Sequence, residues 1–196
     1  ELRFRGTAPD PIARRAPEQT VLLGSFSKTI APGLRMGWMV VPEWLRQPVL
    51  VAKQAADLHS NHLSQRTLVH LLGSLDHDHH LEGINTTYEA RLRAMEAAID
   101  QLRPRVERTR PDGGMFLWLT LPVGLTARRV LDEAMARNVV FVPGDAFSAS
   151  GGSERSLRVS FVTVDPDRIR DGVRRLAEAV GAARTAVPAD PYPSSP

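Results

Sequence analysis

Residues 24–38 constrain the fold of this chain more than any other stretch of its sequence. The apolar run at residues 21–23 predicts a short strand that leads into this stretch, and residues 37–41 predict a second strand. Between them lies a loop of hydroxyl residues and glycines around Lys28, one of two lysines among the 25 basic residues. The sequence therefore predicts a strand–loop–strand unit that holds a single lysine in a defined position.

The side chains of this loop suit one kind of chemistry. We expect Lys28 to be buried, because burial disfavours the charged form of a lysine and the neutral amine can then form a Schiff base with an aldehyde. Ser25 and Ser27 provide hydroxyl groups, and Arg35 provides a planar guanidinium that suits a phosphate. An amine for an aldehyde, with hydroxyls and a guanidinium for a phosphate, is what pyridoxal phosphate requires of a protein.

Two other interpretations of the loop are open at this point. Lys28 could be a solvated loop lysine and Arg35 a surface arginine, because short motifs recur by chance. A nucleoside-triphosphatase loop fits less well, because its motif needs a glycine directly before the lysine. Ser27 stands at that position.

A family resemblance separates these interpretations. Ser-Phe-Ser-Lys-Thr at residues 25–29 and Ala-Pro-Gly-Leu-Arg-Met-Gly at residues 31–37 resemble the cofactor-lysine segment of fold-type I, class I/II pyridoxal-phosphate-dependent aminotransferases. The resemblance is closest to the branch with aminoadipate-type and kynurenine-type aminotransferases and MocR-type regulators. It implies pyridoxal 5'-phosphate as cofactor and Lys28 as the catalytic residue that binds it. The residues implied to hold the cofactor are Ser25, Ser27, Lys28 and Arg35.

A second candidate lies far along the chain, at residues 156–162. Their alternation predicts a strand with Leu157 and Phe161 on one face and Arg158 on the other. Taken alone, such an arginine belongs to a strand surface. The pattern Leu-Arg-Val-Ser-Phe resembles the family strand whose arginine binds the substrate α-carboxylate through a bidentate pair. The resemblance therefore implies that Arg158 binds the substrate.

Residues 76–80 combine three histidines and two aspartates, which raises the question of a metal site. The alternative is the solvated start of a helix. Metal ligands usually come from separate elements and are oriented by further hydrogen bonds. We therefore predict a helix start and no metal.

Composition limits the remaining classes. The chain has no cysteine, which excludes disulfides and cysteine-based sites. The net charge is +3 and the arginines are scattered, so we expect no nucleic-acid contact by this segment. No apolar run approaches the roughly 18 residues of a membrane span, and no signal peptide is recognised. We expect a cytoplasmic protein that does not contact a membrane.

Strands alternate with helices along the chain, which predicts an α/β fold. The predicted helices begin at Pro42 (with an interruption at Pro48), at residue 65 after a Ser64 cap, at residue 81, at residue 127 after a Thr126 cap, and at Asp165. Residues 139–142 predict a short strand, and Asn138 before them a left-handed helix stop.

The family resemblance implies the C-terminal part of a PLP-dependent transferase (aspartate aminotransferase-like) fold. That part would comprise a partial large-domain sheet and a small α/β C-terminal domain. Residues 1–78 are then the remainder of the large PLP-binding domain, residues 79–183 the small C-terminal domain, and residues 184–196 a disordered tail.

The resemblance implies an aminotransferase that moves an amino group between an amino acid and a 2-oxo acid, as a homodimer in the intact parent. Two alternatives stay open. The chain could be the PLP-binding effector domain of a MocR/GntR-type transcription regulator, or an inactive truncated fragment. It starts at Glu1, after the position of the family's Asp-x-x-Tyr pair, so we expect this chain alone to bind the cofactor poorly.

Overall fold

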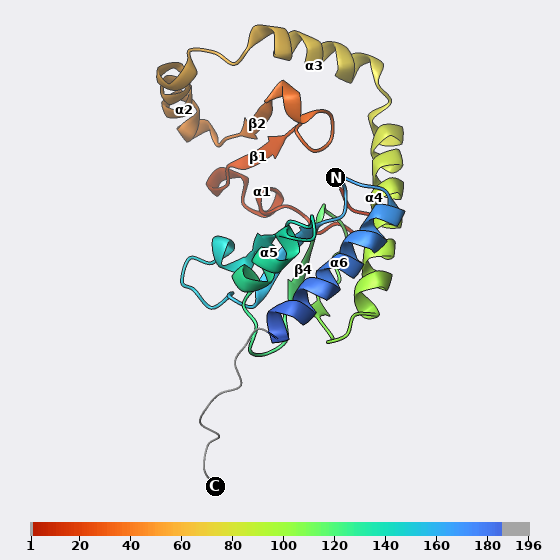
Figure 1. Ribbon diagram of the computed structural model, residues 1–196. Helices are drawn as coiled ribbons and strands as arrows, with labels where there is room; N and C mark the ends of the chain where they lie inside the picture. The colour runs from red at the N-terminus through yellow and green to blue at the C-terminus, as the bar shows by residue number, and fades with distance from the viewer. Residues whose placement is uncertain (1, 186–196) are drawn as a thin grey trace. The chain divides into compact units, whose positions relative to one another are not determined.

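The computed structural model describes residues 2–185, which fall into two compact units (Figure 1). Unit 1 is Glu1–Ile84 and unit 2 is Asn85–Pro196. The boundary lies inside helix α4 (His77–Asp100), whereas the predicted boundary lies between residues 78 and 79. The identification of the units with a large and a small domain stays a prediction.

Unit 1 contains a two-stranded sheet and several helices. In chain order its elements before α4 are α1 (Ile12–Arg15), η1 (Pro17–Gln19), β1 (Leu22–Ser25), η2 (Pro32–Leu34), β2 (Gly37–Val40), α2 (Glu43–Asp57) and α3 (His62–Ser74). Strands β1 and β2 are antiparallel, with Leu22 opposite Val40 and Ser25 opposite Gly37. The predicted strand–loop–strand unit is therefore present, with strand bounds shifted by about a residue.

Helix α2 corrects the predicted interruption at Pro48. The helix is continuous through this proline. A proline removes the hydrogen bond to the carbonyl four residues earlier, which here belongs to Trp44. Trp44 is exposed, so water can solvate its carbonyl and the helix continues.

Helix α3 corrects the predicted cap. The side chain of Asn61 accepts a hydrogen bond from the Ser64 backbone N–H at 2.9 Å, so Asn61 and not Ser64 precedes the helix. Asparagine is as good a cap as serine, and Asn61 stands three residues earlier. The helix begins correspondingly early, at His62.

Unit 2 is built on a four-stranded sheet. After α4 its elements are β3 (Glu107–Arg108), β4 (Phe116–Thr120), α5 (Ala127–Met135), β5 (Val142–Pro143), η3 (Gly144–Phe147), β6 (Ser156–Ser160) and α6 (Pro166–Thr185). The strand order is β3-β4-β6-β5, and every neighbouring pair is antiparallel. Strand β6 therefore lies between β4 and β5.

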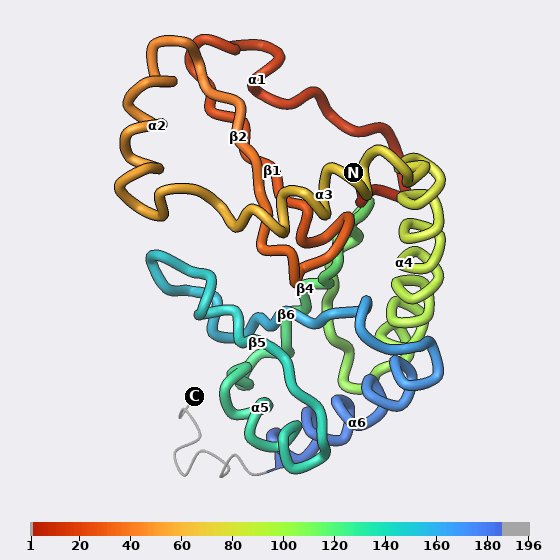
Figure 2. The backbone as a smooth tube through the Cα atoms, turned by 90° about the horizontal axis from the view of Figure 1, so that it is seen from above, coloured from red at the N-terminus to blue at the C-terminus, as the bar shows by residue number. Residues whose placement is uncertain are grey.

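The core of unit 2 lies on one face of this sheet. Leu117, Leu119, Leu157 and Phe161 have no exposed surface. A cavity of about 180 Å³ is lined by residues of β4, β6, α4 and α6, so these helices cover the apolar face. Helices α5 and α6 lie side by side (Figure 2).

Three terminal signals of unit 2 are confirmed. The Thr126 hydroxyl accepts a hydrogen bond from the Arg129 N–H at the start of α5. One Asp165 carboxylate oxygen accepts bonds from Asp167 and Arg168, each at 3.0 Å, at the start of α6. These two bonds hold the pKa of Asp165 below its usual value. Asn138 has a left-handed backbone with φ 59°, as predicted.

Two predicted bounds in unit 2 were wrong. The strand predicted at residues 139–142 begins only at Val142, because the Val139 N–H bonds the Ala134 carbonyl and ends helix α5. Helix α6 includes Arg184 and Thr185, which were predicted to be tail. The rest of that predicted tail lies outside the described residues. Among residues 2–185, every helix is too short or too polar to cross a bilayer.

Candidate active site

The loop that follows β1 is closed by backbone hydrogen bonds. The Phe26 N–H donates to the Met36 carbonyl at 3.1 Å, which extends the β1–β2 pairing by one step. The Ile30 and Ala31 N–H groups both donate to the Phe26 carbonyl, at 2.9 and 3.1 Å. These bonds fold residues 26–31 into a single tight turn. Lys28 therefore stands at the middle of a backbone-ordered turn.

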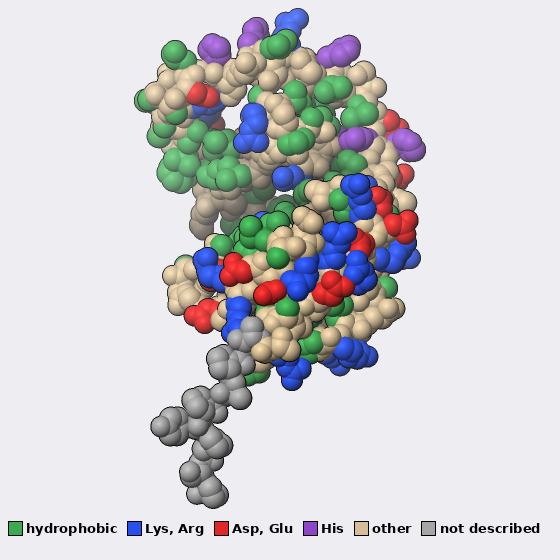
Figure 3. Space-filling view, viewed as in Figure 1, with side chains coloured by type: hydrophobic (Ala, Val, Ile, Leu, Met, Phe, Trp, Pro, Cys, Tyr) green, Lys and Arg blue, Asp and Glu red, His purple; other side chains and the backbone are tan. Residues whose placement is uncertain are grey.

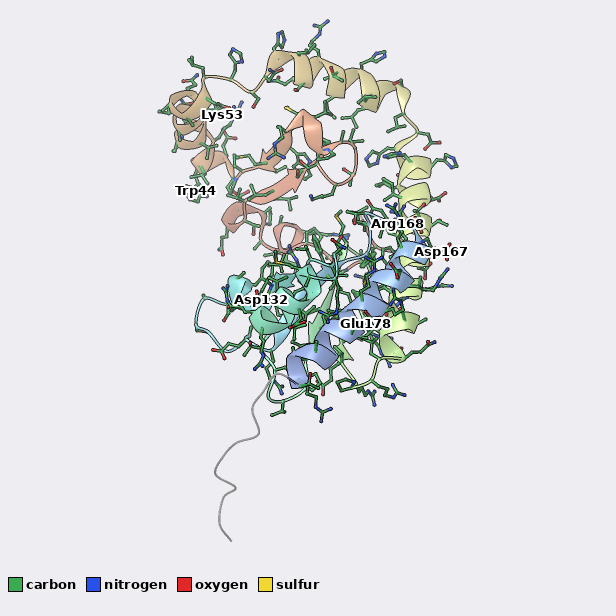
Figure 4. All side chains as sticks on the ribbon, viewed as in Figure 1. Trp44, Lys53, Asp132, Asp167, Arg168 and Glu178 are labelled. Carbon is green, nitrogen blue, oxygen red and sulfur yellow. The ribbon has the colours of Figure 1, made fainter. Side chains whose placement is uncertain are left out.

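The Lys28 side chain is exposed, which corrects the expected burial. The neighbouring residue Thr29 is buried, so only one side of the turn is covered, and Lys28 lies on the other side. Within residues 2–185 the Lys28 amine forms no hydrogen bond and no ion pair. Lys53, labelled in Figure 4, lies on α2. It differs from Lys28, because its amine binds the Asp57 carboxylate at 2.8 Å and the Ser60 hydroxyl at 3.1 Å. Of the two lysines, Lys28 is the one whose amine is available.

The two predicted serines lie at the start of the same turn. The Ser25 hydroxyl accepts a hydrogen bond from the Ser27 N–H at 3.2 Å and keeps its own hydrogen to donate. The Ser27 hydroxyl has no partner within the described part of the chain. The loop therefore offers two hydroxyl donors beside Lys28.

Arg35 closes the loop from the other end. Its backbone is left-handed, with φ 52° and ψ 36°, and its N–H donates to the Pro32 carbonyl at 3.3 Å. A non-glycine residue rarely adopts this conformation, so the turn imposes it. The guanidinium is exposed, and its one hydrogen bond within residues 2–185 is a 3.5 Å contact to the Pro32 carbonyl. Most of its donors remain available.

Gly24 allows a close approach between the two strands. A Cβ atom at this position would lie 2.1 Å from the Trp38 indole, which is directly opposite. Any larger residue would therefore displace Trp38. This close contact between Gly24 and Trp38 holds β1 in place directly before Ser25.

The donor set fits the group that the sequence predicts. A Schiff base needs an amine that is not engaged elsewhere, and Lys28 provides one. A phosphate needs hydroxyl or guanidinium donors, and Ser25, Ser27 and Arg35 all keep free ones. The Phe26–Met36 bond holds the two ends of the loop together, so all four residues belong to one local segment of the chain.

Arg158 lies on β6, the third strand of the sheet order in unit 2. It is directly opposite Trp118 of β4 and Val142 of β5. Its neighbour Leu157 is fully buried, so Arg158 points away from the core, as predicted. The Arg158 side chain is half-buried, and its Nε lacks a hydrogen-bond partner among the described residues. Buried N–H groups in proteins are normally hydrogen-bonded, so the Arg158 Nε–H is a donor that calls for an acceptor.

The predicted site residues therefore form two groups. Ser25, Ser27, Lys28 and Arg35 share the loop of unit 1, whereas Arg158 belongs to unit 2.

Residues 76–80 begin helix α4. The Asp76 carboxylate accepts a hydrogen bond from the His79 N–H at 3.1 Å. Within residues 2–185, no group of three or more His, Cys, Asp or Glu side chains could hold a metal ion. His80 has another contact: its Nε2 is 2.8 Å from the carbonyl of Thr29. This bond connects α4 to the residue that follows Lys28.

Sequence reasoning did not predict three contacts that are made near the candidates. His80 reaches the lysine turn from 51 positions away, and Phe116 and Phe147 contact the Arg158 guanidinium. No local pattern reveals such contacts, because they depend on which elements pack together. For Phe116, the one feature visible in the sequence was a phenylalanine at the start of a predicted strand.

Comparisons with known proteins identify the family of this chain. Residues 5–176 match the family described as Aminotransferase class I and II. The 2-aminoadipate transaminase of Thermus thermophilus is 44% identical over 171 residues, which are 86% of this chain and 43% of that protein. An uncharacterised HTH-type transcriptional regulator of Bacillus subtilis, YisV, is 28% identical over 180 residues, or 91% of this chain and 37% of that protein.

A solved structure is similar over nearly the whole chain. The α-aminoadipate aminotransferase LysN of Thermus thermophilus, complexed with N-(5'-phosphopyridoxyl)-L-leucine, gives a TM-score of 0.86 at 41% identity. The match covers 95% of this chain and 49% of that one. The predicted fold class is thereby confirmed. This chain spans less than half the length of these relatives.

Proposed function

Because this chain belongs to the family of class I and II aminotransferases, we propose that it is part of a pyridoxal-phosphate-dependent aminotransferase. The intact protein would transfer an amino group between an amino acid and a 2-oxo acid. The observation that supports this most is the loop around Lys28, where a free amine lies among free hydroxyl and guanidinium donors. The relative in complex with a phosphopyridoxyl compound supports the choice of cofactor.

The proposal gives a role to each of the candidate site residues. When bound, pyridoxal phosphate supplies an aldehyde and a ring that withdraws electrons from the substrate α-carbon. Lys28 Nζ would hold the cofactor through its aldehyde carbon until the amino group of the substrate displaces it, and the freed amine would then take the proton from the α-carbon and later return one. Ser25, Ser27 and Arg35 donate hydrogen bonds to the phosphate. Arg158 binds the α-carboxylate and orients the substrate.

The scarcity of lysine makes the test unusually clean. The intact protein is mixed with pyridoxal phosphate and reduced with borohydride, and the labelled peptides are identified by mass spectrometry. We expect the label on Lys28. Lys53 serves as the internal control, because its amine is paired with Asp57. Label on Lys53 or the N-terminal amine, with none on Lys28, contradicts the proposal.

The phosphate contacts are tested with the same readout. Arg35→Leu should lower the labelling of Lys28 by pyridoxal phosphate but not by pyridoxal, which has no phosphate. An equal loss with both reagents would mean that Arg35 acts on the turn itself and does not bind a phosphate.

The similarity to a transcriptional regulator supports a second candidate function. In that case Lys28 would bind the cofactor to sense an amino acid without turnover. Single-turnover assays on the intact protein separate the two functions. Formation of a 2-oxo acid from an amino acid supports the enzyme, and labelling of Lys28 without such a product supports the sensor.

Three further properties belong to the same proposal. We propose that the intact protein is a homodimer, that it acts in the cytoplasm, and that this segment does not contact nucleic acid. The net charge of +3 and the many arginines paired with acidic side chains support the last point. Light scattering of the intact protein and a binding assay with duplex DNA test the first and the third.

A further inference from the structure

The Arg158 guanidinium is in contact with two aromatic rings. Its central carbon is 3.9 Å from the centre of the Phe116 ring and 4.3 Å from the centre of the Phe147 ring. Both distances are those of a stacked cation and ring. Because only one ring fits against each face of a planar guanidinium, the two rings cover both faces. Phe116 and Phe147 are called the aromatic pair below.

The aromatic pair is itself held in place by the fold of unit 2. Phe116 begins β4, two residues before Trp118, which is opposite Arg158. The three side chains therefore share one face of the sheet. The Phe147 ring meets the Trp118 ring edge-on, with the centroids 5.8 Å apart and the planes at 67°. This T-shaped contact fixes the second ring of the pair.

The turn that carries Phe147 is also constrained. Gly144 begins η3 and is buried, and a Cβ atom there would lie 2.8 Å from the Ser153 carbonyl and from Ser156. The segment before β6 therefore packs directly on the start of η3. The turn that carries Phe147 is therefore held against the start of β6, the strand that carries Arg158.

With both faces covered, the donors of Arg158 are available only at the edge of the guanidinium. The Nε is buried and, among the described residues, lacks a partner. A buried donor without an acceptor is costly, and a carboxylate in the guanidinium plane would satisfy it. A ring on each face also prevents the guanidinium from tilting out of that plane.

We propose that Phe116 and Phe147 are positioning residues, which hold the Arg158 guanidinium in the orientation that binds a carboxylate edge-on. This inference rests on the proposed role of Arg158 in binding the substrate carboxylate. The aromatic pair acts before any ligand arrives, because it restricts the rotation of the guanidinium in the free protein. The ligand class is a 2-oxo acid or amino acid with its carboxylate in the plane of the guanidinium.

The first experiment measures this restriction without ligand. In the 196-residue chain, ¹⁵N relaxation of the Arg158 Nε–H group reports its mobility, and the signal is assigned by its loss in Arg158→Lys. We expect a rigid Nε–H in the unchanged chain and a clearly more mobile one in the Phe116→Leu/Phe147→Leu double variant. Met135→Leu, an exposed apolar change on α5, is the control. Equal mobility in the double variant and the control overturns the inference.

The second experiment measures the binding of 2-oxoglutarate to the 196-residue chain and its variants by calorimetry. Loss of a cation–ring contact should weaken binding about 3- to 10-fold for each leucine variant. Phe116→Tyr should retain the affinity, because tyrosine keeps the ring face. Circular dichroism establishes that each variant is folded.

Arginine variants separate failure of the inference from failure of the function. Arg158→Leu should abolish binding, and Arg155→Leu, an exposed arginine near the start of the same strand, should not. If Arg158→Leu abolishes binding and the leucine variants of the aromatic pair do not weaken it, the positioning role is overturned and the proposed function stands. If Arg158→Leu binds as well as the unchanged chain, the carboxylate role of Arg158 is overturned, and with it the inference.

Discussion

The two units differ sharply in how much apolar surface they bury. Among the described residues of unit 1, Leu68 and Pro42 are the only apolar side chains that are buried. Its sheet leaves Leu23, Met39 and Val40 exposed. All other buried apolar side chains belong to unit 2, where the sheet packs against α4, α5 and α6. Unit 2 therefore has a hydrophobic core and unit 1 does not.

The surfaces differ in the same sense. Figure 3 shows hydrophobic side chains gathered around α2 in unit 1, whereas α6 in unit 2 carries mixed basic and acidic side chains. A hollow of about 610 Å³ in unit 1 is lined mainly by apolar residues of β1, β2 and α2, together with Arg46 and Lys53. Apolar burial is the main favourable term in folding, so unit 2 should dominate the stability of this chain.

The comparison bears directly on the two groups of site residues. Arg158 stands on a sheet with a closed core, while Lys28 stands on a turn ordered mainly by its own backbone bonds. The orientation of Arg158 is therefore fixed by packing, and that of Lys28 depends on local hydrogen bonds. The predictions below test this difference, from the largest expected effect to the smallest.

The largest contrast should come from the same leucine-to-alanine change in each unit. Leu119 on β4 has no exposed surface, and Leu23 on β1 is 69% exposed. We expect Leu119→Ala to lower the free energy of unfolding of unit 2 by about 2–5 kcal/mol. Leu23→Ala should change stability by less than about 0.5 kcal/mol. Urea unfolding followed by hydrogen exchange resolves both units, and equal effects would refute the comparison.

The next effect concerns an ion-pair network in unit 2. Arg108 donates to Glu96 at 2.8 Å and forms two 2.8 Å bonds with the Asp100 carboxylate. Arg108 and Glu96 are each only 12% exposed, so Arg108→Met removes a cation from a nearly buried carboxylate. We expect a loss of about 2–4 kcal/mol in unfolding free energy.

The matched control for this change is Arg93→Met. Arg93 pairs with Glu89 at 2.7 Å but is 69% exposed, so its removal should cost at most about 0.5 kcal/mol. Similar losses for both variants would show that burial does not determine the strength of these pairs.

In unit 1 the sharpest test is the bond between His80 and the Thr29 carbonyl. We expect His80→Ala to cost about 1 kcal/mol and to speed hydrogen exchange at residues 26–31. His80→Gln should restore part of the protection, because its amide can donate to the same carbonyl. His79→Ala is the control, since His79 is exposed. Unchanged exchange in His80→Ala would mean that the turn orders itself.

The smallest effect should be on the acid stability of unit 2. The hydrogen bonds from Arg108 hold the pKa of Asp100 below its ordinary value of 3.8. A lowered folded-state pKa contributes stability that is present above pH 3.8 and lost as the pH falls through the folded value. We expect Asp100→Asn to be less stable than the unchanged chain near neutral pH, with the difference shrinking below pH 3.8. A difference that grows with acid would contradict the sign.

The features that could be predicted from the sequence are those that depend on short-range patterns. The family resemblance of residues 24–38 is confirmed by the match over residues 5–176. The strands around Lys28 and the caps Thr126 and Asp165 were also found, because each depends on neighbours within a few positions.

The errors share a different cause. The burial of Lys28 was wrong because exposure depends on what packs over the turn, which no local pattern specifies. Pro48 was wrongly expected to break a helix: Trp44, whose carbonyl loses its hydrogen bond, is an exposed residue. The contacts of His80 and of the aromatic pair join residues distant in sequence, so they depend on packing and strand register.

The left-handed backbone of Arg35 carries a consequence for engineering this chain. Glycine or asparagine would relax that residue and raise stability by removing a conformational penalty. Both would also delete the guanidinium of the loop. A selection for heat resistance alone should therefore discard Arg35, and a selection for retention of a phosphorylated aldehyde should keep it. Under the role proposed for Arg35, this position exchanges backbone stability for one guanidinium.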